Sequence, residues 1–385
     1  MAALPNEQDA IARIELEGPI ALNPANFTSL QRTPWAGVEL ASGIKKNQAE
    51  TPTQRIGESW EISCDPEAPS NIRNIPHLTL AELIARYPEE CLSRQLIASG
   101  RTTCDILIKL LNADAPLSLQ IHPSDSNASL KINECGKPES WLVLSAKPGS
   151  GFYLGFSQPI PISVIREKIE TETFSPDLLQ FVPVSPGDYF EIEPHVPHAI
   201  GPGIVLLEPQ RIIAGKSGKT WRLWDWNRKY RRDGSIDPQN GTPRELHIKD
   251  SIALLDPKSQ SGSQYLAKLR RKAETVKPAN GVIIEAYPAN EWYQTLLIKM
   301  EPRSRLKLNA SICFGCATIL QGSLQATSTK NRQITMRQGE SFFLPAQGLP
   351  TELANEDQPA LLTLVIPAGQ GIPKEHSGNI SLIFC

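Results

Sequence analysis

Short apolar runs interrupted by proline and glycine constrain the fold of this sequence more than any other feature. The chain has 385 residues, of which 33 are proline and 25 are glycine, and both residue types interrupt helices and strands. Strand-length runs at short spacing are typical of a β-sandwich or a β-barrel. The runs that carry this prediction are residues 104–111, 140–144, 203–208 and 295–299.

Helical patterns are fewer, so we expect helices only as decoration of a mainly β fold. Thr79 is a candidate cap for the first of them and Ser163 for the second. A Ser/Gly/Gln-rich gap at residues 259–264 lies between the last two and is the best candidate for a domain linker. The expected helices cover residues 78–86, 162–169, 245–255 and 265–274.

A weak internal repeat indicates two similar domains. Residues 187–198 align with residues 339–350. Both stretches begin with glycine and an acid, as in a turn before a strand, and both continue through an aromatic-rich strand into a proline-containing bend. The second copy has Pro350 where the first has His198. If the repeat is real, only the first domain carries chemistry at this position.

Charge and hydropathy argue against two classes of partner. The chain has 39 Lys and Arg against 41 Asp and Glu, a formal net charge of −2, which argues against a nucleic-acid binder that works by bulk positive charge. No apolar run approaches the ~18 residues of a membrane helix, and the N-terminus lacks the pattern of a signal peptide. We therefore expect neither a nucleic-acid partner nor a membrane.

The seven cysteines are an odd number and too few for a disulfide scaffold. The simplest interpretation is a protein of the reducing cytoplasm. Cys313 and Cys316 form a single CxxC pair that could be redox-active or half of a zinc site. With no second pair, and in a strand-like stretch, a structural role is favoured.

A polar triplet on one predicted strand marks a candidate site. Ser118, Gln120 and His122 alternate by two and therefore point to the same face. Such a face is costly in a dry core, so it favours a cavity or a metal site. Glu139, at the start of a strand, and His198, after a bend, are further candidates. Two imidazoles and a carboxylate, with a possible glutamine, suit zinc and also Fe(II) in a facial triad.

Several motifs together resemble those of class I mannose-6-phosphate isomerases, which are zinc cupins. The metal motifs are similar to Gln120-x-His122-Pro, Gly136-Lys-Pro-Glu139-Ser-Trp and Pro197-His198-Ala-Ile-Gly. Residues 34–37 and 56–63 resemble the N-terminal signature of the bacterial enzymes, and residues 221–228 resemble the stretch that holds their active-site arginine. The ordered matches cover over half of the chain.

The resemblance implies two cupin-like jelly-roll barrels. A catalytic domain with helical insertions is expected over residues 1–258, and a second domain without metal ligands over 259–385. The resemblance also implies one zinc per chain and a catalytic role for Arg222. Ser118 and Lys137 lie beside the ligands and are candidates for contacting a sugar phosphate. The implied zinc ligands are Gln120, His122, Glu139 and His198.

The sequence departs from the family in the bend before His198. The usual Pro-Ala-Gly is replaced there by Glu193-Pro194-His195. His195 adds a second imidazole near the site, but a fifth ligand would crowd a metal that must keep a position open. We expect His195 not to bind the metal. The stretch of residues 208–219 is also longer and more basic than is usual.

The expected activity is the interconversion of mannose 6-phosphate and fructose 6-phosphate by proton transfer through an enediol(ate). The base remains open among a zinc-bound hydroxide, Glu208 and Lys137. The alternatives are a non-haem Fe(II) cupin oxygenase and a non-catalytic sugar-binding cupin. Oligomeric state is not indicated by the sequence.

Overall fold

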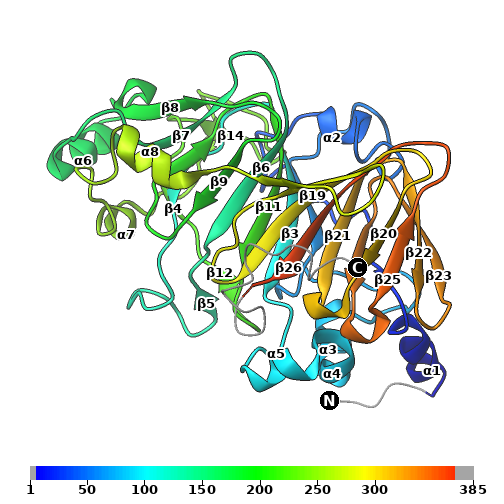
Figure 1. Cartoon of the computed structure of the whole chain (residues 1–385). Helices are drawn as coiled ribbons and strands as arrows, with labels where there is room; N and C mark the ends of the chain where they lie inside the picture. The colour runs from blue at the N-terminus through cyan, green and yellow to red at the C-terminus, as the bar shows by residue number, and fades with distance from the viewer. Residues whose placement is uncertain (1–5, 369–385) are drawn as a thin grey trace.

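Strands dominate the computed structural model of this chain, which describes residues 6–368 (Figure 1). Most of them belong to four sheets of four to seven strands each. The predicted mainly β fold with helical decoration is confirmed. No helix between residues 6 and 368 is long and apolar enough to cross a membrane.

The first half contains a unit of eight strands in two sheets. The larger sheet has the order β16-β9-β6-β11-β3-β2 and the smaller one β13-β4-β10-β7-β8. Three strands add to the edges: β2 (Glu58–Ile62), β13 (Trp221–Trp224) and β16 (Arg270–Arg271). The eight strands are β3 (Ile106–Ala113), β4 (Leu119–Ile121), β6 (Glu139–Ala146), β7 (Gly151–Phe156), β8 (Leu179–Pro183), β9 (Tyr189–Ile192), β10 (His198–Ile200) and β11 (Ile204–Arg211).

The second half repeats this unit strand for strand. Its sheets have the orders β1-β24-β21-β26-β19-β18-β17 and β20-β25-β22-β23. The eight repeated strands are β19 (Tyr293–Met300), β20 (Arg305–Leu308), β21 (Gly315–Gln321), β22 (Ser323–Ser328), β23 (Gln333–Arg337), β24 (Ser341–Leu344), β25 (Thr351–Ala354) and β26 (Ala360–Pro367). Replacing β3, β4 and β6–β11 by β19–β26 reproduces both orders, which are those of an eight-stranded jelly roll.

The duplication explains the short sequence repeat. Gly187 and Gly339 both have positive φ, +91° and +81°, in the turn two residues before β9 and β24. A side chain at Gly339 would also meet the side chain of Gln48 and the carbonyl of Ile44. Glycine is therefore required there for its backbone conformation and for close approach.

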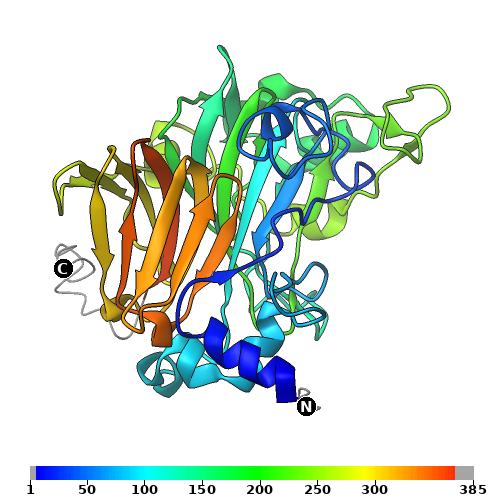
Figure 2. The ribbon, with the colours of Figure 1, turned by 90° about the vertical axis from the view of Figure 1, so that its right-hand side faces the viewer.

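Two strands from one half of the sequence pair with a sheet of the other half. Strand β1 (Ile20–Ala21), near the N-terminus, pairs with β24 in the sheet of the second unit (Figure 2). Strand β16, beyond residue 258, pairs with β9 of the first unit. The gap at residues 259–264 is held to the first unit at Gln260, which is buried and donates to the carbonyl of His195 at 2.7 Å. The division at residue 258 stays a prediction.

The helices predicted over residues 78–86 and 162–169 are present, whereas the one predicted over 245–255 forms only over residues 248–252. The predicted cap Thr79 is confirmed as the N-cap of helix α3 (Leu80–Arg86), where it also forms a capping box with Glu82. For α6 (Ile162–Glu170) the Ser163 cap is wrong: the N-cap is Pro161, and Ser163 lies inside the helix. The remaining helices are α1 (Asn6–Glu15), α2 (Glu39–Ser42), α4 (Pro88–Leu92), α5 (Arg94–Ala98), α7 (Ile248–Ile252) and α8 (Ser263–Leu269).

The helix predicted over residues 265–274 is wrong in its second half. Helix α8 ends at Leu269 because Arg270 and Arg271 pair with β9. Four short strands complete the two-stranded pairs, and β18 and β17 extend the second unit. They are β5 (Glu134–Cys135), β12 (Ser217–Gly218), β14 (Lys229–Tyr230), β15 (Thr242–Pro243), β17 (Glu274–Val276) and β18 (Val282–Ala286).

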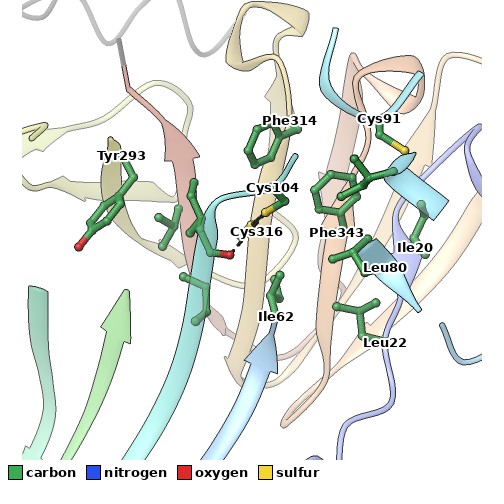
Figure 3. Packing of buried hydrophobic residues seen from close by; sticks show 14 of the residues in the cluster. Ile20, Leu22, Ile62, Leu80, Cys91, Cys104, Tyr293, Phe314, Cys316 and Phe343 are labelled. Carbon is green, nitrogen blue, oxygen red and sulfur yellow. Dashed lines mark hydrogen bonds between the residues drawn. The ribbon is translucent and has the colours of Figure 1, made fainter. Parts of the chain in front are cut away.

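Among the buried apolar clusters of residues 6–368, three join the sheets to one another. One lies between the two sheets of each unit. The third joins the outer faces of the two larger sheets, where side chains of β3 and β11 meet those of β19, β21 and β26. Figure 3 shows part of this core, including Tyr293 of β19 and Cys316 of β21. Within it, Cys316 Sγ lies 3.9 Å from Cys104 Sγ, so this cysteine of the CxxC pair packs at the junction of the units.

Candidate metal centre and active site

Three predicted ligands converge inside the first unit. His122 directly follows β4, Glu139 begins β6 and His198 begins β10. Each offers a ligand atom within 4.8 Å of the others. Nε2 of His122 lies 3.3 Å from Oε2 of Glu139, and Nε2 of His198 lies 3.5 Å from Oε1. All three are buried, and no other such group of His, Cys, Asp or Glu occurs within residues 6–368.

Both imidazoles are oriented to use Nε2. Nδ1 of His122 lies 3.0 Å from the carbonyl oxygen of Lys219, and Nδ1 of His198 lies 2.8 Å from that of Val196. A carbonyl only accepts, so each Nδ1 carries the proton and each Nε2 presents a lone pair. Both Nε2 atoms are buried and have no hydrogen-bond partner. These residues therefore fit a metal ion with the outer hydrogen bonds that metal-binding histidines usually make.

The electrostatics keep the ligand atoms in the form that binds a metal. Burial and the Lys137 cation lower the pKa of His122 from 6.5 to about 3, and burial also lowers the pKa of His198. Burial opposes ionisation of Glu139, but the Lys137 cation and the two imidazoles hold its pKa well below the usual range. At neutral pH the cluster therefore holds two neutral imidazoles and one carboxylate.

Glu139 is also held by two neighbours from the same unit. Gln210 donates to its Oε2 at 2.8 Å, and Nζ of Lys137 lies 3.3 Å from the same oxygen. Burial would lower the pKa of Lys137, but Glu139, Glu208 and Glu58 raise it overall. Lys137 is therefore a cation beside the cluster.

A cavity of about 160 Å³ adjoins the cluster. The other predicted site residues, Ser118, Gln120, Lys137 and Arg222, all line it together with Glu139. The charged side chains that line the cavity include four that were not predicted as site residues. One of the four, Lys109, lies within a strand that is otherwise largely apolar. A charge at such a position indicates a buried polar site. These additional charged residues are Arg32, Glu58, Lys109 and Arg244.

Gln120 and Arg222 face each other across neighbouring strands. Gln120 of β4 pairs with His198 of β10 on one side and with Arg222 of β13 on the other. Nη1 of Arg222 donates to the carbonyl of Glu245 at 2.8 Å, while its Nε is buried without a partner. Burial and the nearby Arg244 lower the pKa of Arg222 to about 10, so the guanidinium is charged at neutral pH.

A second carboxylate faces the cavity from β11. Glu208 accepts from Nε1 of Trp141 at 3.1 Å and lies 3.8 Å from Nζ of Lys109. Lys109 also lies 4.0 Å from Glu58. Burial and the charge of Glu139 raise the pKa of Glu208 to about 8. The two buried carboxyl groups therefore differ, because the pKa of Glu208 is raised and that of Glu139 is lowered.

His195 does not belong to the cluster of His122, Glu139 and His198. Its backbone has a φ of +72°, which is uncommon for a residue with a side chain. Its N–H donates to the carbonyl of His122 at 2.8 Å, so its backbone supports a ligand. Burial lowers the pKa of its imidazole.

Fold and site together define a double-sheet β protein with a candidate metal centre. Residues 28–140 match the sequence model of the phosphomannose isomerase type I catalytic domain. Over this segment, which contains His122 and Glu139, the chain is similar to the type I phosphomannose isomerase family.

Two curated relatives are similar in sequence to this chain, one over most of its length and the other over about half. Mannose-6-phosphate isomerase of Streptococcus mutans is 28% identical over 314 residues, which cover 81% of this chain and 88% of the relative. Mannose-6-phosphate isomerase ManA of Bacillus subtilis is 32% identical over 213 residues, or 53% of this chain and 60% of the relative.

Solved structures share the fold. The crystal structure of mannose 6-phosphate isomerase from Bacillus subtilis has a TM-score of 0.70 at 22% identity and covers 90% of this chain and 99% of its own. The Salmonella typhimurium enzyme, solved with fructose 6-phosphate and zinc, has a TM-score of 0.64 at 16% identity, with 91% and 100% covered.

Proposed function

We propose that this chain is a zinc-dependent isomerase that interconverts mannose 6-phosphate and fructose 6-phosphate in the cytoplasm. The observation that carries the proposal is the cluster of His122, Glu139 and His198 beside a cavity that Arg222 and Lys137 also line. The curated relatives named mannose-6-phosphate isomerases support the substrate. The free cysteines among residues 6–368 suit a reducing compartment.

The proposed zinc ligands are His122, Glu139 and His198, with Gln120 as the fourth. Two unpartnered Nε2 atoms and an ionised carboxylate suit this ion. When bound, zinc polarises the sugar oxygens and stabilises the negative charge that develops on them. We expect one zinc per chain, in a catalytic domain over residues 1–258, with none in a second domain over 259–385.

Arg222, Ser118 and Lys137 are the proposed contacts of the sugar phosphate. All three line the cavity. The guanidinium of Arg222 offers a rigid fork of donors to an oxyanion or a phosphate without losing its charge. Lys137 contributes a second positive charge, and the hydroxyl of Ser118 contributes a neutral donor.

Glu208 is the proposed base, because it lines the cavity and carries a carboxyl group with a raised pKa. The reaction moves a proton between C2 and C1 of the sugar, so the carrier must both accept and return it. Its raised pKa of about 8 makes Glu208 suited to both steps near neutral pH. Lys137 is a weaker candidate, because its pKa is raised above an already high value and its Nζ contacts Glu139.

A coupled assay of mannose 6-phosphate turnover, with the metal content measured in the same sample, tests the proposal. We expect conversion to fructose 6-phosphate that is lost with zinc and restored with it. Activity that requires iron and O2 would instead support the oxygenase. A sugar phosphate that binds without turnover would support a non-catalytic binding protein.

A further inference from the structure

One histidine holds the backbone of Arg222 through two hydrogen bonds. The N–H of Arg222 donates to Nδ1 of His247 at 3.1 Å, and the N–H of His247 donates to the carbonyl of Arg222 at 2.7 Å. Strand β13 lies at the edge of its sheet, where outward backbone groups have no neighbouring strand. His247 therefore takes the place of a neighbouring strand at this single residue.

The segment that ends in His247 also holds the guanidinium. The carbonyl of Glu245 accepts from Nη1 of Arg222 at 2.8 Å. Arg244 is fixed in turn by Asp225, which accepts from its Nε at 2.8 Å and from its Nη2 at 2.7 Å. Helix α7, which follows His247, packs against β13. Residues 244–247 thus determine where both the backbone and the side chain of Arg222 lie.

We propose that His247 is a positioning residue for Arg222, and that protonation of its imidazole releases β13 at this point and lowers activity in acid. The inference rests on the proposed isomerase function. A neutral imidazole can accept at Nδ1, whereas an imidazolium carries protons on both nitrogens and accepts at neither. Protonation therefore breaks the hydrogen bond from Arg222 and adds a cation beside the guanidinium.

The surroundings of His247 favour its neutral form at neutral pH. Burial is the main cause and lowers the pKa of its imidazole below the usual 6.5. The charges of Arg222 and Lys219, from β13 and the residues before it, act in the same direction. Glu245 and Asp250, from its own segment, oppose them. The predicted loss of activity therefore lies below pH 6.5.

Replacement of His247 by alanine and by asparagine separates positioning from bulk packing. Asparagine offers Oδ1 in place of Nδ1 and does not titrate. We expect His247→Ala to lower kcat/KM by about ten- to a hundredfold, since a small misplacement of a catalytic group has effects of this size. His247→Asn should recover activity to within about threefold. Zinc content should stay unchanged, and the acid loss should be smaller in the asparagine variant.

Hydrogen exchange of the peptide that contains Arg222 tests the contact without turnover. We expect faster exchange in His247→Ala and near wild-type exchange in His247→Asn, with His77→Asn on the exposed surface as the control. If the wild-type chain does not isomerise the sugar, the proposed function fails, while the exchange still decides whether the contact exists.

The inference is overturned if His247→Ala keeps wild-type kcat/KM, or if both variants lose activity equally with unchanged exchange. If the alanine variant does not fold, the pH profiles of the wild type and the asparagine variant are compared instead. An identical loss of activity at low pH in both would overturn the inference.

Discussion

Glu139 and Gly315 occupy equivalent positions in the two halves of the molecule. Glu139 begins β6 and pairs with Ile192 of β9, while Gly315 begins β21 and pairs with Leu344 of β24. The second unit thus keeps the strand framework but has no carboxylate where the first has a metal-binding candidate. The two units therefore share the same strand pairing, but only the first has a side chain at this position that could bind a metal.

Metal content is the first test of this asymmetry. We expect about one zinc per chain by elemental analysis, because only the first unit offers a ligand cluster among the described residues. His122→Ala and His198→Ala should each lower zinc occupancy and activity together. Full activity in a sample stripped of metal would contradict the ligand assignment.

Arg222→Lys tests the guanidinium. Lysine keeps the charge but loses the planar fork, so we expect kcat/KM to fall by roughly two orders of magnitude or more, as for the loss of a transition-state donor. Zinc content, measured on the same preparation, should be unchanged. Wild-type turnover in this variant would remove Arg222 from the catalytic machinery.

Glu208→Gln tests the base. The amide keeps the size of the side chain but cannot carry the proton, so kcat should fall by about 10²- to 10⁴-fold. Zinc occupancy should stay near that of the wild type, because Glu208 is not in the cluster. A matched Lys137→Met variant should mainly raise KM. If kcat fell only in the Lys137 variant, the two assignments would be reversed.

His195→Gly tests whether the unusual bend supplies a ligand. Glycine suits the φ of +72° at this position, and the backbone N–H that bonds to His122 remains. We expect the variant to retain zinc and most activity, whereas His198→Gly should retain neither. Equal loss of metal in both variants would show that the ligand set is wrong here.

The stability of the metal-free protein should fall in mild acid. The pKa of His122 is about 3 when folded, against about 6.5 when unfolded, so the unfolded chain binds the proton first. The stability that this provides is present above pH 6.5 and is lost as the pH falls toward 3, with about 2 kcal/mol lost between pH 7 and pH 5.

Chemical denaturation with a chelator at both pH values measures this effect. His122→Ala should show a smaller difference between them, whereas exposed His77→Asn should match the wild type. An unchanged difference in the His122 variant would contradict the linkage.

Local signals in the sequence predicted the fold elements best. The capping box of Thr79 and Glu82 lies within four residues, and the apolar runs gave the main strands. Ser163 failed as a cap because Pro161 already provides the start of α6. The pairing of Arg270 and Arg271 with β9 depends on residues some 80 positions away, which local pattern cannot reveal.

Only part of the candidate site could be predicted from the sequence. Gln120 lies in β4 and Ser118 and His122 flank this strand directly, so their common face could be predicted from alternation. Glu139 and His198 come from other strands. Their assignment to the same site as His122 depended on the resemblance to a known family, because the spacing along the sequence is not specific. Lys109 and Glu58 could have been noticed as charges within strand-forming segments, but their meeting at one cavity is a tertiary property.

The face-to-face packing of the two larger sheets makes the second half a solvent shield for the first. Leu110 and Leu207 from the first unit, and Leu297 and Val365 from the second, belong to one core. A fragment ending at residue 258 would leave a broad apolar sheet in water and would be prone to self-association. The half without the ligand cluster is thus expected to keep the other half monodisperse.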